Sequence, residues 1–145
     1  VGSEMCIRDS IYTGEPLAFL LDESQIQETI EPYFMARIVD VAQFLRLYPF
    51  EGSIRPFHFV VTDPMAEWNN GIFSVATDRE GTVSVTDEPA GKAVELDIQT
   101  LSAMLMGYKR PSYLARIERL HTDKRTLRLL EEIIPDGQPY FSDYF

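Results

Sequence analysis

The sequence predicts an α+β fold in which helices cover one face of an antiparallel sheet. Short segments of alternating character follow one another between residues 54 and 97, and segments with capping signals and a helical period follow after residue 97. Strands followed by a run of helices are typical of this class. An aliphatic and aromatic content of 45% is sufficient for a proper core.

The chain before residue 54 has fewer regular signals. "LAFLLDE" (17–23) predicts a strand, and "SQIQETIEP" after it predicts a turn of helix that ends at Pro32. "YFMARIV" (33–39) predicts a second strand. Asp40 predicts the N-cap of a helix. Its apolar residues recur at i, i+3, i+4 and i+7, namely Val41, Phe44, Leu45 and Tyr48.

The predicted sheet begins with a β-hairpin. Segment 54–62 alternates, and Asp63-Pro64 opens a turn that leads to segment 72–77. We expect these two strands to be antiparallel neighbours, joined through a loop that carries Trp68 and a positive-φ pair at Asn70-Gly71. "TVSVT" and "AVELD" complete four consecutive strands with short Gly-containing turns, which predicts an antiparallel meander.

Three helices are predicted after the sheet. The first starts at Asp97 and stops at Gly107, and the second starts at Pro111. The third starts at Thr122 or Asp123 and stops at Pro135. The apolar residues of the three helical patterns are Leu101, Met104 and Leu105; Tyr113, Leu114 and Ile117; and Leu127, Leu130 and Ile134.

The first ten residues, "VGSEMCIRDS", resemble a translated sequencing adapter, and we exclude residues 1–10 from the fold as an artefact. The only cysteine, Cys6, is excluded with them, which suits a reducing, cytoplasmic location. The net charge is −10, or −9 without this segment, and this argues against a nucleic-acid partner. No apolar run approaches the roughly 20 residues that span a membrane.

Specific motifs for nucleotides and metals are absent from the sequence, so we expect no metal site. We interpret His58 as a half-buried structural residue in a strand, with a catalytic base as the alternative, and His121 as a residue that satisfies carbonyls at a helix end. Trp68 either lines a pocket or interface or covers the end of the sheet. Met104 and Met106 are interpreted as core residues.

The chain ends on "PYFSDYF" (139–145), an unusually aromatic terminus. Chain ends tolerate change unless they are anchored, and aromatic groups bury large areas, so this segment should dock. Either it fills a gap in the core, or it delivers the terminal carboxylate to a working site.

Four separated motifs carry a family resemblance: "YFMARIVDV", "VTDPMAEWNNGIF", "LDIQTLSAMLMGY" and "PYFSDYF". Over residues 30–145 the chain resembles the C-terminal part of the enhanced intracellular survival (Eis-like) acetyltransferases of the GNAT superfamily. The resemblance implies a sterol-carrier-protein-like domain at residues 36–145 and a remnant of a second GNAT domain at residues 11–35.

The resemblance also implies a catalytic role for Phe145, whose carboxylate takes the proton from an attacking amine. Asp143 and Tyr144 would lie beside the substrate; some relatives carry an acid at the latter position. The cofactor, acetyl-CoA, would be bound by an N-terminal GNAT domain outside this chain. The chain alone should therefore be inactive, and the parent enzyme should act on an amine and form a homo-oligomer.

Two function classes stay open at this point. One is the acetyltransferase domain just described. The other is a non-catalytic module for an apolar ligand or for oligomerisation, and ligand binding would need a cavity of several hundred Å³ between the sheet and the helices. We expect a filled core instead.

Overall fold

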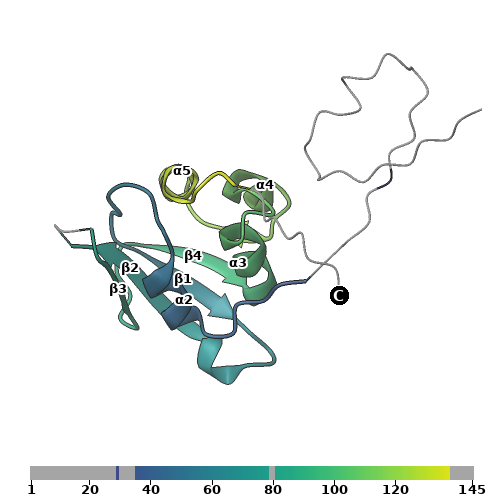
Figure 1. Cartoon of the computed structure of the whole chain (residues 1–145), viewed down its shortest axis with the longest axis horizontal. Helices are drawn as coiled ribbons and strands as arrows, with labels where there is room; N and C mark the ends of the chain where they lie inside the picture. The colour runs from purple at the N-terminus through teal and green to yellow at the C-terminus, as the bar shows by residue number, and fades with distance from the viewer. Residues whose placement is uncertain (1–28, 30–34, 79–80, 138–145) are drawn as a thin grey trace, which may run out of the picture. The chain divides into compact units, whose positions relative to one another are not determined.

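The computed structural model describes Thr29, residues 35–78 and residues 81–137 (Figure 1). The chain divides into two units, Val1–Met35 and Ala36–Phe145, and the description that follows concerns the second. The strand and helical turn predicted within residues 17–32 lie, except for Thr29, outside the described residues. So do Leu17, Phe19 and Leu21, for which we expect exposure to solvent.

The described elements form a mixed α+β unit, which confirms the predicted class. The helices are α2 (Val41–Leu47), α3 (Ile98–Leu105), α4 (Pro111–Arg116) and α5 (Lys124–Ile133), with a 3-10 turn η1 (Glu67–Asn69). The strands are β1 (Phe57–Thr62), β2 (Gly71–Thr77), β3 (Val83–Thr86), β4 (Lys92–Asp97) and β5 (Leu120–His121). The strands form one sheet in the order β3-β2-β1-β4-β5.

The predicted hairpin is confirmed. β1 and β2 are antiparallel, with Phe57 opposite Val75 and Phe59 opposite Phe73. The predicted positive-φ pair is wrong, because Asn70 has φ −79° and only Gly71 has a positive φ, 144°. The connection is not a tight turn but an eight-residue loop that contains η1, so no second positive φ is needed.

The predicted meander is wrong at its last step. β3 lies beside β2 as expected, but β4 lies parallel to β1 on the far side of the sheet. Residues 87–91 therefore cross the face opposite the helices. Ser74 bonds to this crossing through Glu88 O and Ala90 N, and the His58 ring bonds to Ala90 O at 2.9 Å. These side chains hold the crossing segment against β1 and β2.

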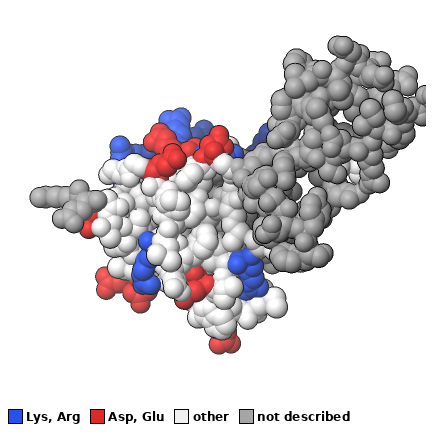
Figure 2. Space-filling view, in the orientation of Figure 1, with Lys and Arg blue, Asp and Glu red and all other residues white. Residues whose placement is uncertain are grey.

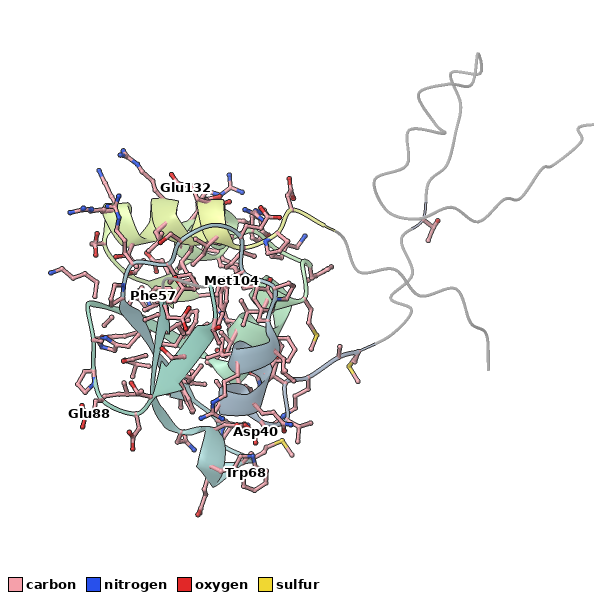
Figure 3. All side chains as sticks on the ribbon, turned by 60° about the vertical axis from the view of Figure 1, so that its left-hand side comes forward. Asp40, Phe57, Trp68, Glu88, Met104 and Glu132 are labelled. Atoms are coloured by element: carbon pink, nitrogen blue, oxygen red, sulfur yellow. The ribbon has the colours of Figure 1, made fainter. Side chains whose placement is uncertain are left out.

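The core lies between the sheet and the helices. Phe57, Phe59 and Val61 alternate toward it from β1, and they meet Val41 and Leu45 of α2 in one buried cluster. Figure 3 shows Phe57 and Met104 in this interior, whereas Trp68 and Glu132 lie at opposite ends of the unit. The other members of the cluster are Ile38, Ile54, Val75, Val94, Leu96, Ile98, Leu101, Met104, Leu105, Leu114, Leu120, Leu130, Ile133 and Ile134.

The helix starts agree with the capping signals. Asp40 accepts from Gln43 N, Asp97 accepts from Thr100 N, and Pro111 occupies the first position of α4. Asp123 is the N-cap of α5. Its hydrogen bonds with the Thr126 hydroxyl and with backbone N–H groups lower its pKa. Thr122, the alternative cap, instead donates its hydroxyl to a carbonyl of β4. The predicted inward residues Leu101, Met104 and Leu105 are buried, whereas Tyr113 and Ile117 of the next helical pattern are exposed.

The C-terminal end of α5 is held by an arginine that the sequence did not single out. The Arg110 guanidinium donates to the carbonyls of Glu131, Ile134 and Pro135 at 2.7 to 3.1 Å. It also pairs with the Glu131 carboxylate at 2.8 Å. The last carbonyls of a helix have no partner within the helix, so this side chain satisfies groups that would otherwise need water.

The strand predicted at residues 33–39 is wrong for its described part, because residues 35–39 pair with no other strand. Their backbone groups bond to side chains instead. Ile38 N donates to the Ser102 hydroxyl, and Val39 O accepts from the side chains of Trp68 and Asn69. Side chains thus take over the bonds that a neighbouring strand would provide.

Gly91 provides a test of the crossing segment. An added Cβ would lie 1.7 Å from Pro56 O. We expect Gly91→Ala to lower the free energy of unfolding by about 3 kcal/mol, as measured by urea unfolding.

Gly52→Ala is the matched control. Gly52 has a similar positive φ, 71° against 68°, but a Cβ added to it would meet no atom within 4 Å. It should therefore lose only the cost of the left-handed conformation, about 1 kcal/mol. Equal losses in the two variants would mean that the close approach of Gly91 to Pro56 does not constrain the fold.

Candidate functional site

The residues predicted as the site, Phe145, Tyr144 and Asp143, lie outside the described residues. Their roles remain predictions, and the described part of the chain provides the framework before them. Within that framework the most connected polar group is a carboxylate at the end of β1, which the sequence indicated only as part of a turn.

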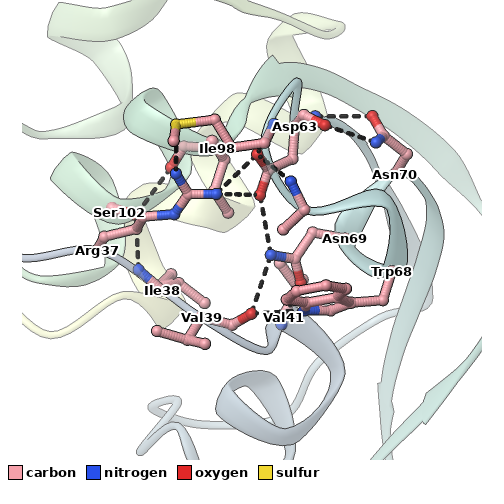
Figure 4. A network of polar contacts seen from close by, with 12 residues as sticks. Arg37, Ile38, Val39, Val41, Asp63, Trp68, Asn69, Asn70, Ile98 and Ser102 are labelled. Carbon is pink, nitrogen blue, oxygen red and sulfur yellow. Dashed lines mark hydrogen bonds and ion pairs between the residues drawn. The ribbon is translucent and has the colours of Figure 1, made fainter.

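The carboxylate of Asp63 is buried and receives donors from several parts of the chain (Figure 4). Both of its oxygens accept from Nη2 of Arg37, at 2.7 and 2.6 Å. Oδ1 also accepts from the backbone N–H groups of Met65 and Ala66, at 3.0 and 3.2 Å. Oδ2 accepts from the side-chain amide of Asn69 at 2.9 Å.

These donors set the protonation state of Asp63. Burial disfavours the charged form of the carboxylate and therefore raises the pKa of Asp63. It is the largest single influence on this pKa. The hydrogen bonds from Asn69, Met65, Arg37 and Ala66 together outweigh burial and lower the pKa to about 2. Asp63 is therefore ionised at neutral pH and is too weak a base to accept a proton there.

The two asparagines of the loop extend the network from Asp63. Asn69 accepts from Val41 N at 3.0 Å and donates to Val39 O at 3.0 Å, so it bonds to the chain on both sides of the α2 N-cap. Asn70 closes a reciprocal pair with the backbone of Asp63, at 2.7 and 2.6 Å. The loop between β1 and β2 is thereby fixed to the segment that enters α2.

The same entering segment is fixed to α3. Ile38 N donates to the Ser102 hydroxyl at 3.1 Å, and this hydroxyl donates to Ile98 O at 2.8 Å. The network thus joins four elements: the entering segment, the end of β1, η1 and α3.

Exposed apolar side chains occur among the residues next to the network in the sequence. Trp68 donates its ring N–H to Val39 O at 2.8 Å, yet 66% of the residue stays exposed. Val39 and Met65 are exposed as well. Trp68 is therefore held at the surface by this hydrogen bond, and it lines neither of the two hollows described below.

The chemistry available to the network is structural. Every buried side-chain nitrogen and oxygen in the described part of the chain has a partner. In residues 35–78 and 81–137, no three His, Cys, Asp or Glu side chains are grouped to hold a metal ion. No described helix is long and apolar enough to cross a bilayer.

The structure agrees with the interpretation of one histidine and contradicts that of the other. His58 is half-buried, and because a carbonyl only accepts, its Nδ1 donates to Ala90 O, in agreement with the structural interpretation. The prediction for His121 is wrong, since it lies in β5 opposite Glu95. The carbonyls at the end of α4 are satisfied by the backbone instead, where Glu118 turns to a φ of 58°.

Two surface hollows are present on the described unit. One, of about 410 Å³, lies over β4 and β5 and is lined in part by Glu95, Arg119 and His121. The other, of about 420 Å³, lies between the start of β1 and α5. Both have charged linings, whereas the space between the sheet and the helices is occupied by the buried apolar cluster.

Neither Arg37 nor the central role of Asp63 was predicted from the sequence. The available signal was the Asp63-Pro64 turn followed by Asn69 and Asn70, since such side chains bond readily to nearby backbone. No local signal marked Arg37, which reaches Asp63 from 26 positions away in the sequence.

Acid unfolding tests the Asp63 network. The folded-state pKa lies at about 2 and an unfolded Asp has a pKa of about 3.9, so the charged carboxylate stabilises the fold fully above about pH 5. That contribution is lost as the pH falls toward 2. We expect the free energies of unfolding of the parent and Asp63→Asn to differ most at neutral pH and to converge at low pH. Urea unfolding between pH 7 and pH 2.5 measures this difference, and a difference that does not depend on pH would contradict it.

Three solved structures provide comparisons. A probable N-acyltransferase from Enterococcus faecalis V583 is 32% identical, with a TM-score of 0.81, over 92% of this chain and 34% of that one. A GCN5-related N-acetyltransferase from Anabaena variabilis ATCC 29413 is 25% identical, with a TM-score of 0.63, over 71% of this chain and 26% of that one. Eis1 from Mycobacterium abscessus is 23% identical, with a TM-score of 0.62, over 75% of this chain and 27% of that one. At this identity the likeness shows the fold alone.

This chain thus spans between about a quarter and a third of the length of these solved proteins. A comparison with curated proteins found no match. The family model of the sterol carrier protein domain matches residues 41–142, which is most of the chain. The Enterococcus protein is named a probable N-acyltransferase and the Anabaena protein a GCN5-related N-acetyltransferase, and this chain belongs to the sterol carrier protein domain family.

Proposed function

We propose that this chain is the C-terminal domain of an acetyl-CoA-dependent amine N-acetyltransferase of the Eis-like kind. The observation that carries the proposal is the 32% identity with the probable N-acyltransferase from Enterococcus faecalis V583 over 92% of this chain. The names of the other two solved proteins, a GCN5-related N-acetyltransferase and Eis1, support the same class.

The proposal divides the enzyme into parts. Residues 11–35 belong to a second GNAT domain, and residues 36–145 form the C-terminal domain. Acetyl-CoA, which supplies the acetyl thioester, is bound by an N-terminal GNAT domain beyond this chain. The chain alone is inactive, and the parent acts in the cytoplasm as a homo-oligomer.

The chemical contribution of this chain is a base at its terminus. The amine substrate must lose a proton as its nitrogen attacks the acetyl group, and the carboxylate of Phe145 accepts that proton. An α-carboxyl group has a pKa of about 3.3 to 3.7, too low for efficient proton transfer at neutral pH. Enclosure by aromatic residues and the nearby charge of Asp143 would raise that pKa. Tyr144, beside it, would contact the substrate.

The framework described above suits this role. The network of Asp63 and Arg37 fixes the segment that enters the domain, and Arg110 fixes the end of α5 and Pro135, close to the start of the terminal segment. General-base catalysis requires a base within hydrogen-bond reach of its proton, so a terminus that acts as a base needs a rigid attachment.

The alternative function, a carrier of apolar ligands, has less support. Such a carrier needs an apolar cavity, and ligand pockets are mostly lined by apolar side chains. In the described residues the space between the sheet and the helices holds a continuous buried core, and the two surface hollows have charged linings.

Changes at the terminus of the full-length parent enzyme test the proposal. Deletion of Phe145 withdraws the carboxylate by about 3.3 Å, and an added C-terminal glycine replaces it with an amide. General-base assistance contributes about 10² to 10⁴ in rate, so both changes should lower kcat by that order while acetyl-CoA binding persists. Steady-state kinetics and calorimetry with acetyl-CoA measure the two effects.

Phe145→Leu is the matched control, because it keeps the carboxylate in place and shortens only the anchoring side chain. It should retain most of the activity. If the deleted and extended enzymes turn over as fast as the parent, the carboxylate is not the base, and the aromatic terminus serves to fill the core.

A further inference from the structure

The hollow between the start of β1 and α5 is lined by four cationic side chains. They are Arg55, Lys92, Arg125 and Arg128, and the hollow measures about 420 Å³. We call it the basic groove. In Figure 2, Lys and Arg atoms gather at the top of the unit, where Figure 1 labels α5, with Asp and Glu atoms among them.

The fold assembles the basic groove from three segments. The backbone of Gly91 lies against Pro56, and this contact brings the neighbouring residues Arg55 and Lys92 to the same rim. The other rim is α5, where Arg125 and Arg128 are three positions apart and so share one face of the helix.

The four cationic side chains of the basic groove make no ion pairs with carboxylates in the described residues. Three other arginines of the described unit are paired with carboxylates: Arg37 with Asp63, Arg110 with Glu131 and Arg119 with Asp97. In residues 35–78 and 81–137, by contrast, no carboxylate lies within 4.0 Å of a charged nitrogen of the four groove cations.

Two carboxylates also line the basic groove, Asp123 and Glu132. Asp123 is engaged as the cap of α5, where it accepts from the N–H groups of Arg125 and Thr126 and from the Thr126 hydroxyl. Four cations against two anions leave a net positive charge in the groove, in a chain whose net charge is −10. Arg125 and Arg128 are like-charged neighbours on α5 and repel each other, while Glu132, four positions after Arg128, lies on the same face as Arg128.

The form and lining of the groove indicate the class of ligand. Its volume falls within the range of small-molecule sites. Guanidinium groups match the oxygens of a phosphate in pairs. Leu129 and Pro56 add an apolar surface beside the cations. We propose that the basic groove binds a small organic phosphate, with the phosphate between the two rims and the apolar part on Leu129 and Pro56.

Phenyl phosphate is a suitable probe, because it joins a phosphate to one apolar ring. The full chain should bind it saturably in a calorimetric titration at low ionic strength, and more weakly as salt is added. Arg55→Gln and Arg128→Gln should each weaken binding about five- to tenfold, and the double variant should weaken it further. Inorganic phosphate should bind more weakly than phenyl phosphate to the parent chain.

Arg46→Gln is the matched control, since this arginine is exposed near the end of α2 and does not line the groove. It should change the affinity by less than twofold. Thermal unfolding of each variant separates a loss of binding from a loss of fold. Equal affinities in the groove variants and the control, or no saturable binding to the parent, would overturn the proposal.

Two further arms separate the sources of the phosphate. Vesicles of phosphatidylcholine, with and without phosphatidic acid, test for a lipid headgroup, and a poly-glutamate peptide tests for an acidic protein partner. Binding to phenyl phosphate that depends on Arg55 and Arg128 supports the small-ligand site. Binding only to the acidic vesicles or only to the peptide overturns it.

Discussion

The burial of one carboxylate, that of Asp63, is the constraint on which the described fold depends most. A buried charge is costly unless donors surround it, and here the donors come from Arg37, Asn69 and the backbone of the following loop. Once the carboxylate is placed, the positions of these donors follow. The segment that enters the domain, the end of β1 and the loop before β2 are then fixed together.

In the sheet, too, side chains form hydrogen bonds to backbone that no neighbouring strand provides. β4 does not pair with β3 but lies parallel to β1. The connection from β3 to β4 must therefore cross β2 and β1. Ser74 and His58, neighbours on the face opposite the core, bond to this crossing. The position of β4 in turn brings α3, which begins directly after it, over the sheet. An apparently minor polar pair therefore affects which helices cover the core.

The proposed terminal base and the proposed phosphate groove place different demands on this framework. The base depends on rigidity, which the Asp63 network and the attachment of Arg110 to the end of α5 provide. The groove depends on an excess of cations over anions in its described lining, which is a local exception to the strongly acidic character of the chain. Both rely on α5, whose two ends are held by Asp123 and Arg110.

The sequence alone determined the elements whose signals are local. Asp40, Asp97, Asp123 and Pro111 marked helix starts correctly, because a cap bonds to backbone within three residues of itself. Alternation also placed Phe57 and Phe59 on one face and predicted the β1–β2 hairpin.

Only the tertiary structure decided what depends on contacts between distant residues. The placement of β4, the pairing of Arg37 with Asp63 and the meeting of Arg55, Lys92 and α5 in one groove join segments 26 or more positions apart. The same reason explains the wrong strand at residues 33–39. The sequence there predicted an extended segment, but whether that segment pairs with a strand or with side chains depends on which neighbours the fold brings to it.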